Sequence, residues 1–360
     1  MKAAAALGVT LLVLTGCASN EPGNNGDDDN ASTLSGTLAG EGASSQDAAQ
    51  QQGWIPAFQT AHTNVTINYA PSGSGTGREA FQKGGVAFAG SDRAFKTSEI
   101  EKGPFEACTT SNLVEIPAYI SPIAIIVNVE GVKELSLDAD TIAKIFTGQI
   151  TKWNDPAIVA TNASAKLPDA AINPVHRSDK SGTTGNFTEY LAAAAPSSWT
   201  AGSVESWPAE ISGGEAAQGT SGVVAAVKNG VGTIGYADAS RADGLTTVKV
   251  KVGGEFVAYS PEAAAAIVDA SPLETGRTAN DLAIKLDRTS SAKGVYPIVL
   301  VSYLVACESY KDAANAELVK AYFEYIVSKE GQEAAAKASG SAPISDSLRS
   351  KAAAAVGSIK

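Results

Sequence analysis

Three short clusters of glycine and hydroxyl residues have the composition of an anion-binding site. Each is predicted to follow a strand and to begin a helix, where backbone N–H groups have no helical partner and peptide dipoles add partial positive charge. Glycine lets an anion approach the backbone closely, and the hydroxyl groups are further donors. The clusters are Gly42-Ala43-Ser44-Ser45, Gly73-Ser74-Gly75-Thr76 and Ser181-Gly182-Thr183. One cluster alone is weak evidence, because serine and threonine are ordinary helix N-caps.

An arginine and an aspartate next to the third cluster strengthen the prediction. Arg177 lies four residues before Ser181, at the end of a predicted strand, where its guanidinium can pair bidentately with an oxyanion. Asp179 is its expected ion-pair partner and would fix the orientation of the arginine. The alternative is that these two residues form only a surface ion pair.

Asp92, in Gly90-Ser91-Asp92, is unexpected beside an anion site, because a carboxylate repels an anion that has no proton. Phosphate carries a proton at neutral pH, whereas sulfate does not. An ionised Asp92 would accept a hydrogen bond from phosphate and would face a sulfate oxygen with no proton between them. A buried acceptor left unpaired in this way can discriminate by a factor of roughly 10⁴. The alternative role for Asp92 is a helix N-cap.

An enzyme is the first alternative function. A serine hydrolase or secreted phosphatase with Ser181 or Ser74 as nucleophile needs a general base. The two histidines are His176, which strand alternation directs away from the side of Arg177, and His62, which ends a predicted helix. The sequence shows no metal-ligand spacing of histidine, cysteine and carboxylate residues. We therefore expect no catalytic residue, no metal and no cofactor.

Two other binding functions remain as alternatives. The chain could bind another oxyanion, such as sulfate or molybdate, and Asp92 is the residue that argues against this. It could also bind a nucleotide at Gly73-x-Gly75-x-Gly77, but this spacing fits neither the Walker nor the dinucleotide pattern.

The elements that would position these residues alternate as in an α/β fold. Strands are predicted near residues 37–39, 65–69, 86–89, 114–129, 172–175, 232–236 and 296–305. Helices are predicted around residues 54–58, 79–83, 137–146, 187–194, 223–228 and 315–327.

The long apolar runs at 114–129 and 296–305 are candidates for strands that cross between two lobes. The first lobe would then be discontinuous, with residues 36–120 plus 296–360, and residues 121–295 would form the second lobe. This layout leaves a cleft between the lobes and lets them hinge around a ligand.

The N-terminal residues 1–16 are typical of an export signal, with Lys2 followed by a short apolar run. Leu14-Thr15-Gly16-Cys17 resembles a bacterial lipobox, so we expect lipidation of Cys17 and membrane attachment through its acyl chains. The following residues 17–35 are rich in Asn, Asp and Gly and are predicted to form a disordered tether.

Composition excludes some partners. The chain has 360 residues, 44% of them hydrophobic, which is enough to bury a sizeable core. Its net charge of −11 argues against nucleic acid or anionic lipid as a partner. Cys108 and Cys307 could form a disulfide in an oxidising compartment or could be small buried hydrophobic residues.

Taken together and in order, these motifs resemble the phosphate-binding proteins of the phosphate-specific ABC transport system, the PstS family. The resemblance covers nearly all of the chain after the tether. The residues that carry it are Gly40-x-Gly42-Ala43-Ser44, Gly73-Ser74-Gly75, Gly90-Ser91-Asp92, the segment from Ile145 to Trp153, and Arg177-x-Asp179-x-Ser181-Gly182-Thr183.

The resemblance implies a two-lobed periplasmic-binding-protein (Venus flytrap) fold, in which each lobe is a mixed sheet flanked by helices and the ligand lies between the lobes. It also implies a monomeric, non-catalytic, extracytoplasmic lipoprotein that delivers inorganic phosphate to a membrane permease. The family's contacts transfer to Ser44, Ser45, Ser74, Asp92, Arg177, Ser181, Gly182 and Thr183, with Asp179 as the salt-bridge partner. Ser45 occupies a place where the family often has an aromatic residue.

Overall fold

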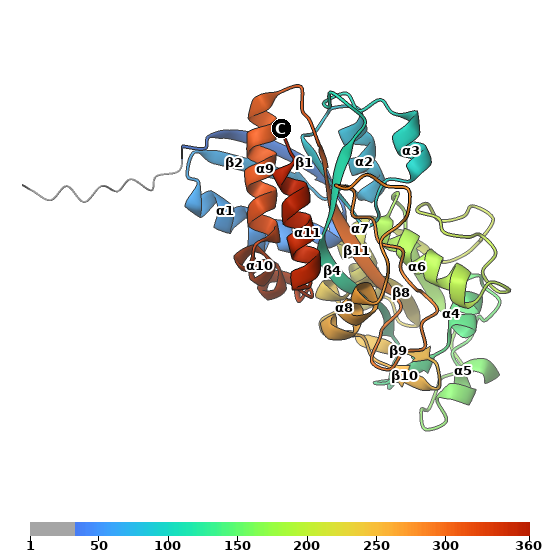
Figure 1. Ribbon diagram of the computed structural model, residues 1–360. Helices are drawn as coiled ribbons and strands as arrows, with labels where there is room; N and C mark the ends of the chain where they lie inside the picture. The colour runs from blue at the N-terminus through green and yellow to red at the C-terminus, as the bar shows by residue number, and fades with distance from the viewer. Residues whose placement is uncertain (1–32) are drawn as a thin grey trace, which may run out of the picture. The chain divides into compact units, whose positions relative to one another are not determined.

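Two long antiparallel strands run through the middle of the fold (Figure 1). They are β4 (Leu113–Asn128) and β11 (Val299–Cys307), which pair from Val299 opposite Pro122 to Cys307 opposite Leu113. The computed structural model describes residues 33–360, so the predicted signal peptide, Cys17 and most of the tether lie outside the described residues.

The strand β4 changes its main partner along its length. Its first part, up to Pro122, pairs with β11, and its last part, from Ile123 to Asn128, pairs with β8 (Thr233–Asp238). One sheet therefore continues in the order β2-β1-β3-β11-β4-β8-β6-β7.

On one side of this pair lie three parallel strands: β1 (Gly36–Gly42), β2 (Val65–Ala70) and β3 (Phe88–Ser91). On the other side, β6 (Asn173–Arg177) pairs in parallel with both β8 and β7 (Glu215–Ala217). A further strand, β9 (Thr246–Val252), pairs with β4, and β9 in turn pairs with β5 (Leu135–Leu137) and β10 (Glu255–Val257).

Helices cover the sheet and begin at its strand ends. The short helices η1 (Ser44–Gln46) and η2 (Ala49–Trp54) lead into α1 (Ile55–Ala61), and α2 (Ser74–Gln82) and α6 (Gly182–Ala194) follow β2 and β6. The other helices between residues 97 and 269 are α3 (Thr97–Lys102), α4 (Ala139–Phe146), α5 (Pro156–Thr161), α7 (Gly219–Asn229), η3 (Ala239–Arg241) and α8 (Pro261–Asp269).

Three helices end the chain: α9 (Ala313–Val327), α10 (Lys329–Ser339) and α11 (Asp346–Gly357). They lie together in Figure 1, and α9 packs on β1 while α11 packs on β4. Trp54, Tyr119 and Tyr322 are fully buried in the core that these elements share. Within residues 33–360, no helix combines the length and the apolarity that crossing a membrane requires.

The structure shifts several predicted boundaries. The helices that contain residues 79–83 and 187–194 begin at Ser74 and Gly182, so the second and third clusters begin helices as predicted. The predicted strand at 296–305 begins only at Val299, after Pro297, whose ring nitrogen has no hydrogen to donate to a ladder. The sequence did not predict α8, α10, α11 or β9.

Cys108 and Cys307, whose pairing the sequence left open, form a disulfide with a Cα–Cα distance of 5.3 Å. The bond joins the segment before β4 to the last residue of β11, across a sequence separation of 199.

Candidate anion-binding site

The three glycine and hydroxyl clusters meet at one place, although they lie far apart in the sequence. Their backbones hydrogen-bond to one another or to a shared neighbour: Gly73 N–H donates to Gly42 O (2.8 Å), and Gly75 N–H donates to Lys180 O (3.1 Å). Gly42 and Gly73 have φ values of 148° and 109°, which favour glycine and let β1 and β2 turn sharply into the following helices.

Asp92 lies at the centre of this convergence. Its backbone N–H donates to Ser74 Oγ of the second cluster (3.1 Å), and its Oδ2 accepts from Thr183 Oγ1 of the third (3.2 Å). Its Oδ1 accepts from Ser45 Oγ of the first cluster (2.5 Å). Gly182 is close as well, since a Cβ atom on it would lie 2.4 Å from Ser74 Oγ.

The Asp92 carboxyl is 2% exposed and makes no N-cap contact, so the alternative role as a helix cap does not apply. Burial raises its pKa, while hydrogen bonds from Ser45, Ser302 and Thr183 and the charge of Arg177 act in the opposite direction. The side chain is thus a buried acceptor surrounded by donors.

Arg177 and Asp179 form a buried, two-pronged ion pair. Arg177 Nε and Nη2 donate to the two carboxylate oxygens of Asp179 at 2.7 and 2.5 Å. The same Nη2 donates to Ser44 Oγ at 3.1 Å, so the arginine also reaches the first cluster. Burial alone raises the pKa of Asp179, but hydrogen bonds and charge from Arg177 outweigh it and lower the pKa. The pair is therefore buried and not, as the alternative interpretation had it, on the surface.

Ser181 and the residues after it form the start of α6. Ser181 Oγ accepts from Thr184 N–H (3.1 Å) as the N-cap of this helix. Gly182 and Thr183 follow in the first turn, where no helical carbonyl accepts from their N–H groups. These N–H groups and the helix dipole give this corner of the site a partial positive charge.

Sequence reasoning missed four residues that contact the site: Gly219, Thr220, Asn186 and Ser302. Thr220 Oγ1 lies 3.0 Å from Ser44 Oγ, and Gly219 N–H donates to Asp179 Oδ1 at 3.0 Å. These residues begin α7 within Gly219-Thr220-Ser221-Gly222, a fourth cluster of the same composition, so the signal was present.

Asn186 and Ser302 gave no such signal. Asn186 Nδ2 donates to Asp92 O (2.6 Å) from the second turn of α6, and Ser302 Oγ donates to Asp92 Oδ1 (2.7 Å) from inside an apolar strand. His176, as expected, points away from the Arg177 side chain and stacks on Trp207 with 4.6 Å between ring centroids.

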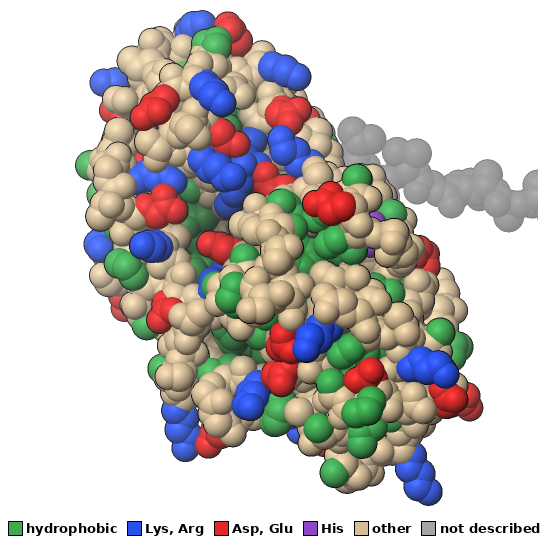
Figure 2. Space-filling view, turned by 90° about the vertical axis from the view of Figure 1, so that its right-hand side faces the viewer, with side chains coloured by type: hydrophobic (Ala, Val, Ile, Leu, Met, Phe, Trp, Pro, Cys, Tyr) green, Lys and Arg blue, Asp and Glu red, His purple; other side chains and the backbone are tan. Residues whose placement is uncertain are grey.

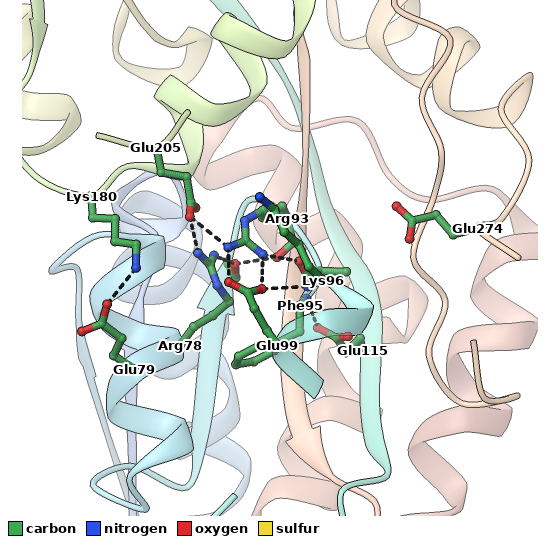
Figure 3. A network of polar contacts seen from close by, with 12 residues as sticks. Arg78, Glu79, Arg93, Phe95, Lys96, Glu99, Glu115, Lys180, Glu205 and Glu274 are labelled. Atoms are coloured by element: carbon green, nitrogen blue, oxygen red, sulfur yellow. Dashed lines mark hydrogen bonds and ion pairs between the residues drawn. The ribbon is translucent and has the colours of Figure 1, made fainter. Parts of the chain in front are cut away.

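A network of arginine and glutamate residues borders the site (Figure 3). Arg78 of α2 and Arg93, two residues after β3, both donate to Glu205 Oε2, at 2.5 and 3.0 Å. Arg93 also pairs with Glu99. The backbone of Glu205 accepts from Ser181 N–H (2.9 Å), which connects this network to the start of α6.

Next to Asp92 is a cavity of about 330 Å³. Basic and acidic side chains both line it, among them Arg93, Lys96, Glu189, Glu274, Arg277 and Arg288. Figure 2 shows lysine and arginine side chains gathered with acidic ones in the upper half of the face that it views.

Comparison with known proteins places the chain among solute-binding proteins. The family model described as a PBP superfamily domain matches residues 28–330. Phosphate-binding protein PstS3 of Mycobacterium bovis BCG is 34% identical over 329 residues, which cover 90% of this chain and 86% of that protein. PstS 2 of Mycobacterium tuberculosis is 34% identical over 365 residues, covering 97% and 95%.

The solved structures agree on the fold. A high-affinity periplasmic phosphate-binding protein solved with bound phosphate has a TM-score of 0.70 at 23% identity, covering 89% of this chain and 93% of that one. A phosphate-binding protein of Stenotrophomonas maltophilia has a TM-score of 0.69 at 22% identity, covering 89% and 94%. The fold is the mixed α/β periplasmic-binding-protein fold, as the resemblance implied. The chain belongs to the PstS family of phosphate-binding proteins, which are binding proteins and not enzymes.

Proposed function

We propose that this protein binds inorganic phosphate outside the cytoplasm and delivers it, chemically unchanged, to the permease of a phosphate ABC importer. The observation that carries the proposal is the convergence of three helix starts on one buried acidic residue, Asp92, with Arg177 bonded to Ser44 of the first helix start. Oriented donors match the oxygens of phosphate, and the acceptor matches its proton.

Each predicted residue has a role in the proposed site. Ser44 and Ser74 supply hydroxyl groups, the Thr183 hydroxyl donates to Asp92, and Arg177 supplies a guanidinium that Asp179 holds in place. The backbone N–H groups of the helix starts supply the other donors. These belong to Ser44, Ser45, Gly182 and Thr183. The N–H of Ser181 donates to Glu205 O, so this residue supplies its hydroxyl hydrogen instead.

We also propose the two-lobed division, with residues 36–120 and 296–360 in one lobe and residues 121–295 in the other. The change of partner along β4, between Pro122 and Ile123, lies two residues after the proposed boundary and supports it. The proposed site then takes Ser44, Ser74 and Asp92 from one lobe and Arg177 and Thr183 from the other, so that binding joins the lobes.

We propose that acyl chains on Cys17 anchor the protein to the cell membrane, with residues 1–16 removed as a signal and 17–35 as the tether. The lipobox-like Leu14-Thr15-Gly16-Cys17 supports this, and the Cys108–Cys307 disulfide suits an oxidising compartment. Metabolic labelling with palmitate tests it: the native chain should be labelled and Cys17→Ser should not. Equal labelling of both would contradict the anchor.

Calorimetric titration of the protein with phosphate and with sulfate tests the function. We expect tight binding of one phosphate per chain and no competition by excess sulfate. Preferential binding of sulfate or molybdate would overturn the proposal in favour of another oxyanion. Turnover of a chromogenic phosphate ester would instead favour a secreted phosphatase.

A further inference from the structure

Ser302 is a buried hydroxyl group in an otherwise apolar strand. Its neighbours Val301 and Tyr303 on β11 are buried as well, and Ser302 is fully buried. The pairing of β11 with β4 shifts register between Ser302 and Tyr303, at the position of an irregularity that redirects side chains. Ser302 Oγ lies 2.7 Å from Asp92 Oδ1. Packing of the strand requires no hydroxyl here, so its contact with the carboxylate needs an explanation.

The direction of the Ser302 hydroxyl is set by Gln46. The Gln46 side-chain Nε2 donates to Ser302 Oγ (2.7 Å) and to Tyr303 O (3.1 Å). Because an amide N–H donates only, Ser302 Oγ is an acceptor toward Gln46 and its own hydrogen is free for Asp92. The serine therefore donates to the carboxylate.

The chain of hydrogen bonds continues away from the site in the same direction. Gln46 Oε1 accepts from Gln50 Nε2 (3.1 Å), and Gln50 Oε1 accepts from the Tyr322 hydroxyl (2.7 Å). Every donor from Tyr322 onward thus points toward Asp92, and all of these side chains are buried. Successive hydrogen bonds with a common direction polarise one another and strengthen the last one, which is made to the carboxylate.

We infer that Ser302 is a positioning residue, the last member of a buried donor chain that keeps Asp92 an ionised acceptor and so sets the choice between phosphate and sulfate. The inference rests on the proposed function and adds the residues that control its selectivity. Ser302 and Ser45 both donate to Oδ1 of Asp92, at 2.7 and 2.5 Å. Oδ2 meets Thr183 at the longer distance of 3.2 Å and is the oxygen left for the proton of phosphate.

Other charged groups act on Asp92 from the surrounding elements. Arg177 of β6 favours its ionised form. Asp238 of β8 and Tyr69 of β2 have pKa values that are raised mainly by burial and further by the charge of Asp92. Charged groups also line the adjoining cavity: Arg93, Lys96, Glu189, Glu274, Arg277 and Arg288. Removal of the Ser302 hydroxyl leaves all of these in place, so its effect on the pKa of Asp92 can be measured separately.

Carbon-13 NMR of aspartate carboxyl groups, in protein free of phosphate, measures this pKa directly, with Asp92→Asn used to assign the signal. Burial raises the pKa of Asp92 and the hydroxyl of Ser302 lowers it. We expect Ser302→Ala to raise it further, by about one pH unit, because a hydrogen bond to a charged group is lost. Ser302→Thr, which keeps the hydroxyl, should restore the native value. Ser339→Ala, which removes another buried serine hydroxyl that bonds to Ala335 O, should leave it unchanged.

Sulfate competition against phosphate, measured over a pH series, is the functional readout. Sulfate should begin to compete as pH falls and Asp92 gains a proton, and this onset should move to higher pH by the same amount in Ser302→Ala. An unchanged pKa and an unchanged onset in Ser302→Ala would overturn the inference.

A second variant covers the case in which Ser302→Ala does not fold. Gln46→Met keeps the side-chain length and removes the donor that directs the Ser302 hydroxyl, so the pKa of Asp92 should rise, and no rise would refute the donor chain. Failure of the native protein to bind phosphate would contradict the proposed function. The NMR measurement needs no phosphate, so it would still test whether the donor chain lowers the pKa of Asp92.

Discussion

At the scale of single residues, the site combines donors with one acceptor, Asp92, and we propose that this acceptor gives the selectivity. Asp92 is buried and accepts three hydroxyl hydrogen bonds. An anion without a proton therefore places an oxygen against a carboxylate oxygen of Asp92 with no hydrogen between them. The sequence was sufficient to predict that Asp92, Arg177 and the three clusters lie together, because their residue types have an evident chemistry.

We predict that Asp92→Asn weakens the discrimination of phosphate from sulfate by at least about a hundredfold. The amide has nearly the same shape and can donate to an oxygen that carries no proton. Calorimetric competition between the two anions measures the ratio. A variant that still rejects sulfate as the native protein does would refute the role of Asp92.

Gly182 is predicted to tolerate no side chain. A Cβ atom there would lie 2.4 Å from Ser74 Oγ and 2.6 Å from Asp92 Cβ, so Gly182→Ala must push the second and third clusters apart. We expect phosphate affinity to fall about tenfold or more, in line with the cost of overpacking. In the matched control Gly222→Ala, the nearest atom is 3.5 Å away, and affinity should not change. Equal affinities of both variants would contradict this geometry.

At the scale of elements, helix starts bring residues from distant segments to one point, and an ion-pair network ties the same segments together. Glu205 receives Arg78 from α2 and Arg93 from the segment after β3, and its side chain is 11% exposed. The Lys180–Glu79 pair bridges similar segments, but its side chains are 42% and 53% exposed.

We predict that Glu205→Gln lowers the free energy of unfolding by about 2 kcal/mol, because two charge-assisted hydrogen bonds lose their anion. It should also speed the release of phosphate. Glu79→Gln, the control, should change either quantity little, since exposed ion pairs contribute at most about 1 kcal/mol. Denaturant unfolding and stopped-flow release measure both. Equal effects of the two variants would contradict a special role for Glu205.

The same interaction predicts a pH dependence. Burial raises the pKa of Glu205, but the charges of Arg78 and Arg93 outweigh it and lower the pKa. A carboxyl with a lowered pKa stabilises the fold fully above its unfolded pKa, and this stabilisation is lost as pH falls through the folded pKa. The stability difference between the native protein and Glu205→Gln should therefore shrink in acid.

The elements also show where sequence reasoning ends. Strands such as β4 and β11 were evident from their apolar length, and the helix starts at Ser74 and Gly182 were evident from the composition of the second and third clusters. Asn186 and Ser302 could not be found, because only the tertiary arrangement brings an asparagine of α6 and a serine of β11 to Asp92.

At the scale of the whole molecule, the Cys108–Cys307 disulfide joins the two ends of a long segment, which includes all of residues 121–295. We predict that Cys108→Ala with Cys307→Ala lowers the free energy of unfolding by about 2–5 kcal/mol, because the unfolded chain gains freedom. Phosphate affinity should change far less, since neither cysteine contacts Asp92 or Arg177. Denaturant unfolding and calorimetry check both statements, and unaltered stability of the double variant would contradict the first.

A crystal structure of the protein with phosphate tests the central claim most directly. One phosphate ion should lie within hydrogen-bond distance of Asp92, Arg177 and the first turns of η1, α2 and α6. A phosphate ion bound away from Asp92, or contacts to only one of these helix starts, would contradict the account.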